Sequence, residues 1–383
     1  MTYRVPFVNY PLQYSLLKNE IDEKIHTLLS RGDLYLRDDT IFFEKNFATF
    51  IGSRFGISTN SCTDSLFLSL YAAGIGKGDE VITVSHTYIA TIASIVHTGA
   101  TPILVDVGED YNMDMELLED AITPRTKAVI PVHLNGRCCD MDRLMKIAYK
   151  HNLVVVEDAA QAVGAEFNGK KAGSFGLTGC FSFYPAKILG CYGDGGFITT
   201  NNELLAEKLY LLRDNGEKAR YLMKDPEEAK DKKIYLFGFN SVLDNIQAGI
   251  LNIKLKYLRR WIERRREIAK MYNDGLSDIE EIKLPPPPTA NTPYFDVYQN
   301  YVIRLRERDK LAGYLEKNGV ETMVSWRTPN HLQSALKLNH FNLPETEKLS
   351  KEVLSLPIYP ELTNEQVVYV IETVKKFFKV KRL

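Results

Sequence analysis

Runs of consecutive apolar residues, rich in Val and Ile, alternate along the first half of the chain with stretches in which apolar residues recur every three or four positions. Consecutive apolar positions are typical of strands buried on both faces, and helical spacing predicts helices at 11–30 and 39–51. This alternation predicts an α/β fold with a mostly parallel central sheet between two layers of helices. The clearest strand-like runs are 80–84, 101–107, 128–133 and 153–158.

The last third of the chain has a different pattern. After a long helical region at 243–272, consecutive prolines at 285–288 form a stiff connector. Shorter elements then predict an α+β arrangement: a strand at 298–305, a helix at 310–317, a strand at 320–324 and a last helix with a capping-box-like start at 363–366. We therefore expect a large domain over residues 1–250 and a small α+β domain over residues 251–383.

The composition excludes several classes of protein. The chain has 383 residues, 25% of them charged, and a formal net charge of -1, which favours neither nucleic acid nor an anionic membrane as a partner. No apolar run approaches the ~20 residues that span a bilayer. The five cysteines have a spacing that fits neither a disulfide framework nor a zinc site, so we expect no metal and a cytoplasmic location.

A glycine-rich stretch at 74–79 invites a dinucleotide-binding interpretation. It precedes a strand, whereas the dinucleotide fingerprint links a strand to the helix that follows. We therefore interpret it as a loop and exclude an NAD-dependent oxidoreductase.

One lysine, Lys187, has an unusual setting. It ends the sequence Phe-Ser-Phe-Tyr-Pro-Ala-Lys, and a glycine-dense turn and the apolar run 197–200 follow it. Apolar and small neighbours would desolvate the amine and lower its pKa, which is what a lysine that forms a Schiff base requires. A solvated loop lysine is the alternative, and this stretch alone does not decide between the two.

Polar groups follow two of the predicted strands. Tyr88 comes after the strand 80–84, and Asp158 ends the strand 153–158, with Gln161 three residues further on. In a parallel sheet, ligands bind at the carboxyl ends of the strands. Asp158 either caps a short helix at 159–161 or faces the protonated ring nitrogen of a pyridine cofactor.

A turn rich in hydroxyl and amide side chains, residues 60–65, opens a predicted helix. Such a turn is an N-cap, and it is also suited to a phosphate, because free backbone N–H groups and the helix dipole point at it. Ordinary caps are far more common than phosphate sites, so both interpretations stay open here.

Together these groups are the ones that pyridoxal phosphate (PLP) uses: a lysine for a Schiff base, an acid for the ring nitrogen, hydroxyls for the phosphate and an aromatic ring for the ring face. The chain carries Asn-Ser-Cys-Thr-Asp-Ser-Leu, Val-Glu-Asp-Ala-Ala-Gln-Ala-Val-Gly-Ala, Gly-Ser-Phe-Gly, Gly-Asp-Gly-Gly and Gly-Phe-Asn-Ser-Val-Leu-Asp-Asn-Ile-Gln-Ala in this order, with the lysine motif between the third and fourth. In these motifs it resembles the DegT/DnrJ/EryC1/StrS family of sugar aminotransferases. The match runs from Val5 to 356–360, nearly the whole chain.

The resemblance implies the three-layer PLP-dependent transferase fold of type I, like that of aspartate aminotransferase. It implies that Lys187 holds the cofactor and shuttles the proton, and that Asp158 pairs with the ring nitrogen. Tyr88 would stack on the ring and Gln161 would contact its 3-hydroxyl. The phosphate would be bound by Thr63, Asp64 and Ser182, with Asn240 reaching it from the neighbouring subunit, so that a homodimer shares each active site.

For the reaction, the resemblance implies transfer of an amino group from L-glutamate to a keto sugar, in particular a nucleoside-diphosphate-linked 3-keto sugar, for surface polysaccharide or secondary metabolite synthesis. Tyr184, Arg327 and His331 would face the substrate. The chain departs from the family pattern at Val242, where an arginine is common, and Arg327 is an extra cation or else a surface arginine. Alternatives are a keto-cyclitol aminotransferase, a PLP-dependent sugar dehydratase, which would carry His at the lysine position, and a non-catalytic regulator with the same fold.

Overall fold

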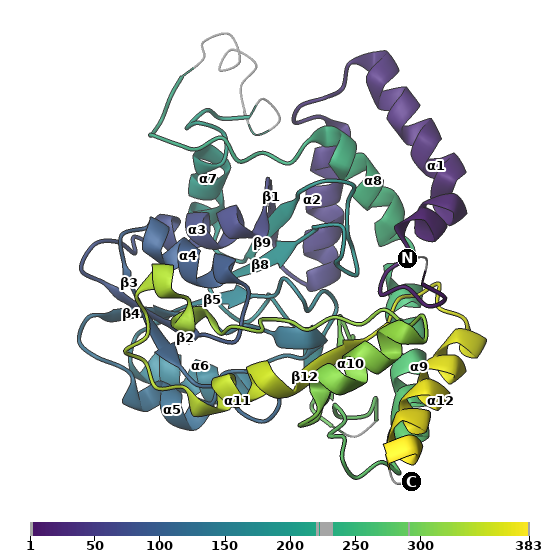
Figure 1. The fold of residues 1–383 in the computed structure, drawn as a ribbon. Helices are drawn as coiled ribbons and strands as arrows, with labels where there is room; N and C mark the ends of the chain where they lie inside the picture. The colour runs from purple at the N-terminus through teal and green to yellow at the C-terminus, as the bar shows by residue number, and fades with distance from the viewer. Residues whose placement is uncertain (1–2, 220–221, 223–232, 290–291, 382–383) are drawn as a thin grey trace.

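The structure is a computed structural model of the chain, and it describes residues 3–219, 222, 233–289 and 292–381. Within them, a central sheet has, in spatial order, the strands β1 (Phe55–Thr59), β9 (Gly196–Thr200), β8 (Thr178–Ser182), β5 (Val154–Asp158), β4 (Thr126–Val129), β2 (Glu80–Val84) and β3 (Thr101–Val105) (Figure 1). The strands from β8 to β3 pair in parallel, whereas β9 is antiparallel to both β8 and β1. The predicted mostly parallel sheet is confirmed.

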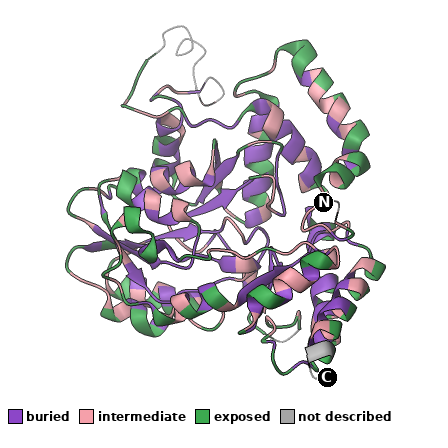
Figure 2. Ribbon diagram, in the orientation of Figure 1, coloured by how far each residue is buried: buried purple, intermediate pink, exposed green. Residues whose placement is uncertain are grey.

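Helices cover both faces of this sheet, which is the middle one of three layers. One face carries α3 (Cys62–Ala72), α4 (Ile89–His97) and α7 (Glu203–Leu212), and the other carries α2 (Asp38–Ile51), α5 (Met115–Asp120) and α6 (Met141–Lys150). Successive side chains of β2 point to opposite faces of the sheet. Val81 packs in the hydrophobic cluster with α3 and α4, and Ile82 packs in the cluster with α5 and α6. The strands are accordingly buried along most of their length, while the helices expose their outer sides (Figure 2).

The long helical region predicted at 243–272 is two helices. They are α8 (Asn245–Leu255), which packs on α2 and on α1 (Tyr10–Arg31), and α9 (Leu258–Leu276). Between them the N–H of Lys256 bonds the carbonyl of Ile253, and the N–H of Tyr257 bonds that of Lys254. These bonds span three residues instead of four, so the chain tightens into a 3₁₀ turn that redirects the second helix.

A second hydrophobic core lies beside the first, at the lower right of Figure 1. It unites α9, α10 (Arg308–Lys317), α12 (Asn364–Lys381) and the antiparallel strands β11 (Tyr301–Arg304) and β12 (Val353–Leu356). The predicted boundary after residue 250 lies within α8, whose Leu251 belongs to the main core. We therefore propose that the small domain begins within α9, since Leu258 and Ile262 still pack in the main core and the second core starts at Ile268.

The strand predicted at 320–324 is wrong. Only two isolated bridges form there, Val320 with Val5 and Met323 with Ser355. The N-terminal segment thus adds a parallel contact to the small domain instead of a full strand.

The remaining elements are short, except for the last helix. The strands β6 (Glu166–Phe167), β7 (Lys170–Lys171) and β10 (Tyr294–Phe295) form a small antiparallel sheet, and the others are α11 (Pro344–Glu352) and the 3₁₀ turns η1 (Leu134–Gly136), η4 (Asn330–Leu332) and η5 (Ser334–Leu336).

The predicted capping box of α12 is confirmed: the N–H of Gln366 donates to Thr363 Oγ1 at 3.2 Å, and the N–H of Thr363 donates to Gln366 Oε1 at 3.1 Å. Among the described residues, no helix has the length and apolar character needed to cross a membrane.

A cluster of phenylalanines pins α2 to the sheet. The Phe47 ring lies 5.1 Å from Phe181 and 4.8 Å from Phe197, centroid to centroid, with rings edge to face, and it is fully buried. We expect Phe47→Ala to lower the free energy of unfolding by about 3–5 kcal/mol, because the site cannot collapse around the missing ring. Urea unfolding would measure this, with Tyr149→Ala, at a 91% exposed position, as the control. Equal midpoints for the two variants would contradict the packing described here.

Candidate active site

A cavity of about 680 Å³ lies where the parallel strands reach their carboxyl ends. It is bounded by the end of β5, by the start of α4 after β2, and by Trp326 from the small domain. Seven of the residues predicted from the sequence line it: Thr63, Tyr88, Asp158, Gln161, Ser182, Tyr184 and Lys187. The topology therefore brings these groups from four separate stretches of the chain to one place.

Lys187 lies in the turn that follows β8 and lines the cavity. Burial lowers the pKa of its amine, and the neighbouring Cys62 and Asp158 offset part of that shift. A lowered pKa increases the neutral fraction of the amine, which is the form that can attack a carbonyl.

Asp158, the last residue of β5, is buried beside the cavity. Thr91 Oγ1 donates to its Oδ2 at 2.8 Å, and the Ala160 N–H donates to its Oδ1 at 3.2 Å. Burial raises the pKa of this carboxyl, and those two hydrogen bonds and Lys187 counter the shift. The helix at 159–161 that a capping role would require is absent, since this stretch forms turns. A buried carboxyl that faces a cavity suits a bound cation, such as a protonated pyridine nitrogen.

The first turn of α3 forms another wall of the cavity. Ser61 caps this helix, because its Oγ accepts the Asp64 N–H at 3.1 Å. First-turn N–H groups have no partner within a helix, so this end of the cavity suits an anion, and Thr63 and Ser182 line it with hydroxyls. The Asp64 carboxylate lies outside the cavity lining and accepts a hydrogen bond from Ser241 Oγ at 2.8 Å.

Gln161 and Tyr88 occupy different settings. Gln161 Oε1 accepts the N–H of Asn135 at 2.9 Å and the side-chain amide of Asn300 at 3.3 Å, so its orientation is fixed. Tyr88, just before α4, is 65% exposed, and its ring is available to cover a ligand in the cavity.

Three further predicted residues are not brought into the cavity of this chain. Asn240 is exposed and does not line it. Arg327 is exposed and forms an ion pair with Asp309 at 2.8 Å. His331 is fully buried, with its Nδ1 2.8 Å from Ser85 Oγ.

The structure adds residues that the sequence analysis missed. Thr91 lies one helical turn after Tyr88, so helical periodicity from Tyr88 could have indicated it. Gln299, Asn300 and Trp326 also line the cavity, but they come from a distant part of the chain and have no local signal.

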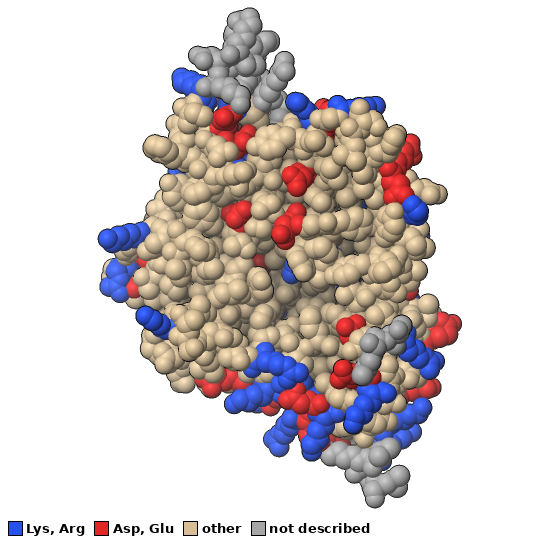
Figure 3. Space-filling model, turned by 45° about the horizontal axis from the view of Figure 1, so that its top comes forward, with Lys and Arg blue, Asp and Glu red and all other residues tan. Residues whose placement is uncertain are grey.

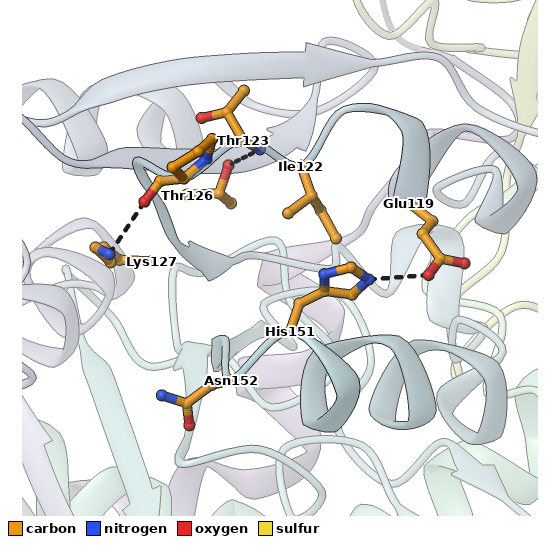
Figure 4. A pocket seen from close by; sticks show the side chains of 8 residues that line it. Glu119, Ile122, Thr123, Thr126, Lys127, His151 and Asn152 are labelled. Carbon is orange, nitrogen blue, oxygen red and sulfur yellow. Dashed lines mark hydrogen bonds and ion pairs between the residues drawn. The ribbon is translucent and has the colours of Figure 1, made fainter.

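A second hollow, of about 430 Å³, lies beside α5, β4 and α6 (Figure 4). Its polar groups bond one another: His151 Nε2 lies 2.9 Å from Glu119 Oε1, and Thr126 Oγ1 accepts the N–H of Thr123 at 2.9 Å. It lies near the amino end of β4, opposite the edge where parallel sheets bind ligands. None of the predicted site residues lines it, and we do not assign it a ligand.

Two relatives are similar over almost their whole length. A protein of Geobacillus stearothermophilus, named pleiotropic regulatory protein, is 40% identical over 379 residues, which is 98% of this chain and 99% of that protein. The dTDP-3-amino-3,4,6-trideoxy-alpha-D-glucose transaminase of Streptomyces venezuelae is 40% identical over 380 residues, 98% of this chain and 97% of that enzyme.

The fold leads to the same group. The crystal structure of Streptomyces venezuelae DesV in complex with a ketimine intermediate superposes with a TM-score of 0.91 at 39% identity, covering 98% of this chain and 99% of that one. This confirms the predicted type I fold, and PLP is the cofactor of these enzymes. The buried amine, the buried carboxyl and the N-terminal end of α3 in the cavity fit that cofactor. With a match over residues 15–375, the chain belongs to the DegT/DnrJ/EryC1/StrS aminotransferase family.

Proposed function

We propose that this chain transfers the amino group of L-glutamate to a nucleoside-diphosphate-linked keto sugar, with PLP held at Lys187. The observation that carries the proposal is that Lys187 and Asp158 line one cavity. Burial lowers the pKa of the first and raises that of the second, so each is poised for a ligand that the cavity would hold. The Streptomyces venezuelae relative is named a transaminase of a dTDP-3-amino sugar, which supports a sugar aminated at carbon 3.

We infer the following roles from the resemblance to the family, and the lining of the cavity supports them. Lys187 Nζ would hold the cofactor at its carbonyl carbon, and as a free amine it would move a proton to and from the substrate carbon. When bound, PLP supplies an electron sink for the carbon that loses this proton. Asp158 keeps the ring nitrogen protonated, and Tyr88 covers the ring face. Gln161, held by Asn135, contacts the ring hydroxyl.

We assign the phosphate to the first turn of α3. Thr63 and Ser182 would bond it directly, since both line this end of the cavity. Asp64 would contribute through its backbone N–H, because its carboxylate is directed to Ser241. To do so, this N–H would have to exchange Ser61 Oγ for a phosphate oxygen.

For the substrate, Tyr184 is the best-placed of the predicted contacts, being 54% exposed in the cavity lining. Arg327 would have to exchange Asp309 for a substrate anion. His331 would act indirectly, by supporting Ser85 at the end of β2.

A homodimer would complete the site. Large apolar side chains are exposed on and just after α1, where a partner could cover them: Leu12, Leu16, Leu29, Leu34 and Tyr35. Charged side chains are sparse over the middle of the face in Figure 3 and gather toward its lower end. Such a face suits association, and the exposed Asn240 would reach the partner's cavity.

The cytoplasm is the proposed location, where the five buried thiols would stay reduced.

Subunit mixing tests the shared site. Lys187→Ala and Asn240→Ala homodimers should each be nearly inactive, but their equimolar mixture, after subunit exchange, should recover about a quarter of wild-type activity. Half of the dimers are then mixed, and one of their two sites has both residues intact. If both residues served the same subunit's site, every site would keep one defect and no activity would return.

The function itself is tested by absorbance of the PLP-loaded protein. L-Glutamate should remove the visible absorbance band of the PLP-loaded protein, because it converts the cofactor to its amine form. A nucleotide-linked 3-keto sugar should restore the band. Restoration by a keto-cyclitol alone would favour that alternative. Because Lys187 occupies the position where the dehydratases carry His, we expect no dehydration product.

A regulator with the same fold is the remaining alternative, and the name of the Geobacillus stearothermophilus relative gives it weight. It predicts that glutamate leaves the spectrum unchanged, or that PLP does not bind. Six of the eight predicted cofactor residues line the cavity of this chain, among them Lys187 and Asp158, and this supports catalysis.

A further inference from the structure

The backbone on both sides of Lys187 is held by a side chain from outside its loop. Gln299 Oε1 accepts the N–H of Ile188 at 2.9 Å, and Gln299 Nε2 donates to the carbonyl of Ala186 at 2.9 Å. The N–H of Lys187 itself donates to the carbonyl of Tyr184 at 2.9 Å. The peptide groups before and after Lys187 are therefore both tied down, while its side chain lines the cavity.

The chemistry of Gln299 matches this task. A carboxamide presents one acceptor and one donor in a plane, which is what a flanking N–H and C=O require. Gln299 is buried at the wall of the cavity, so its carboxamide is largely shielded from competition by water for these two hydrogen bonds. The loop that continues from Lys187 contains Gly190, Gly193 and Gly195, and glycines make a backbone costly to order.

The backbone of Gln299 is fixed in turn. Arg265, buried on α9, donates from Nη1 to the carbonyls of Tyr298 at 3.1 Å, Gln299 at 3.3 Å and Ile358 at 2.8 Å. On the other side, a Cβ added to Gly136 would lie 2.7 Å from the backbone nitrogens of residues 298 and 299. The segment is thus seated between α9 and a glycine that permits its close approach.

The next residue extends the same contact. Asn300 Nδ2 donates to Gln161 Oε1 at 3.3 Å and to Asn135 Oδ1 at 3.2 Å. Two consecutive side chains, from the segment that leads into β11, therefore contact two groups of the proposed cofactor site.

We propose that Gln299 is a positioning residue for Lys187. It fixes the main chain at residues 186–188, so that the amine meets the carbonyl of the cofactor without first ordering a glycine-rich loop. This inference rests on the proposed role of Lys187. It adds the side chain that keeps the lysine in position relative to the cofactor ring.

Hydrogen exchange of the cofactor-free protein tests the contact directly. Gln299→Ala should speed exchange at the Ile188 amide by about tenfold, because the amide loses its acceptor. The matched control is Gln247→Ala, which removes the acceptor of the Tyr192 N–H in the same loop, 2.9 Å away, and should leave Ile188 unchanged. If the Ile188 amide exchanged in Gln299→Ala at the same rate as in the wild type, the proposal would be overturned.

A PLP titration followed by absorbance tests the consequence for the lysine. Gln299→Ala should weaken PLP capture by about tenfold and slow the appearance of the visible band, whereas Gln247→Ala should not. Gln299→Glu keeps an acceptor for Ile188 but places a carboxylate beside Lys187. The pH at which the visible band titrates should therefore rise in this variant, because a nearby negative charge favours the protonated nitrogen.

Failure of the proposed function and failure of the positioning role of Gln299 would give different results. If wild-type protein captures no PLP at Lys187, the proposed function fails, while the exchange result still reports on the contact. If the wild type captures PLP and Gln299→Ala does so with the same affinity and rate, the contact is only structural and the positioning role is wrong. An unshifted titration in Gln299→Glu would also count against it.

Discussion

Replacing Lys187 with alanine should lower the rate of amino transfer by on the order of 10⁴-fold, because one amine would no longer anchor the cofactor or carry the proton. Lys187 lines the cavity, and burial lowers the pKa of its amine, so a larger fraction of this amine is neutral and able to act as a base than in a solvated lysine. The half-reaction with L-glutamate, followed by absorbance of PLP-loaded protein, measures this loss without requiring the sugar.

The control for this variant is Lys170→Ala, which removes an exposed lysine on β7 and should keep full activity. Lys187→Ala should still bind PLP, though without a covalent link, so borohydride would no longer fix the cofactor to the protein. Ordinary turnover by Lys187→Ala would disprove the assignment of the catalytic lysine, whatever the substrate proves to be.

The groups at the strand ends could be predicted because a local pattern determines their place. Asp158 ends an apolar run, and the carboxyl ends of parallel strands share one edge of the sheet. Lys187 stood out for a similar reason, since its apolar and glycine neighbours imply desolvation before any fold is known. These are properties of short windows of sequence, and the fold then only has to bring the windows together.

The residues that were missed depend on how distant segments return to the site. Gln299 meets Ile188 from 111 positions away, and Asn300 meets Gln161 from 139. Neither contact has a periodic or motif signal. The case of His331 is different. Its position in the chain could be matched to a motif, but the direction of its side chain is set by a hydrogen bond with Ser85.

Helix ends and small strands were less predictable for energetic reasons. The break between α8 and α9 needs only two hydrogen bonds that span three residues instead of four, those of the Lys256 and Tyr257 N–H groups. The segment 320–324 has strand-like residues, but its bridges to Val5 and Ser355 are isolated because no neighbour continues the pairing. Tertiary partners override propensity in such short pieces.

Asp158→Asn should lower the rate of the glutamate half-reaction by about 10²–10³-fold, the range found when one preorganised electrostatic group is removed. Asparagine fills the same space and can keep the contact with Thr91, but it is neutral and cannot hold a proton on the ring nitrogen of the cofactor. The hydrogen bond from Thr91 itself, at 2.8 Å, is a smaller contribution, so Thr91→Val should cost about tenfold.

The stability of the cofactor-free protein distinguishes a functional role of Asp158 from a structural one. Burial raises the pKa of Asp158 in the folded chain, so its contribution to stability is full at low pH and declines as pH rises through that raised value. At neutral pH the ionised carboxylate is therefore a cost, and Asp158→Asn should be at least as stable as the wild type by urea unfolding while it loses activity. A variant that loses stability and activity in parallel would mean that Asp158 serves the fold. Activity within threefold of wild type, at unchanged stability, would mean that the ring nitrogen has another partner.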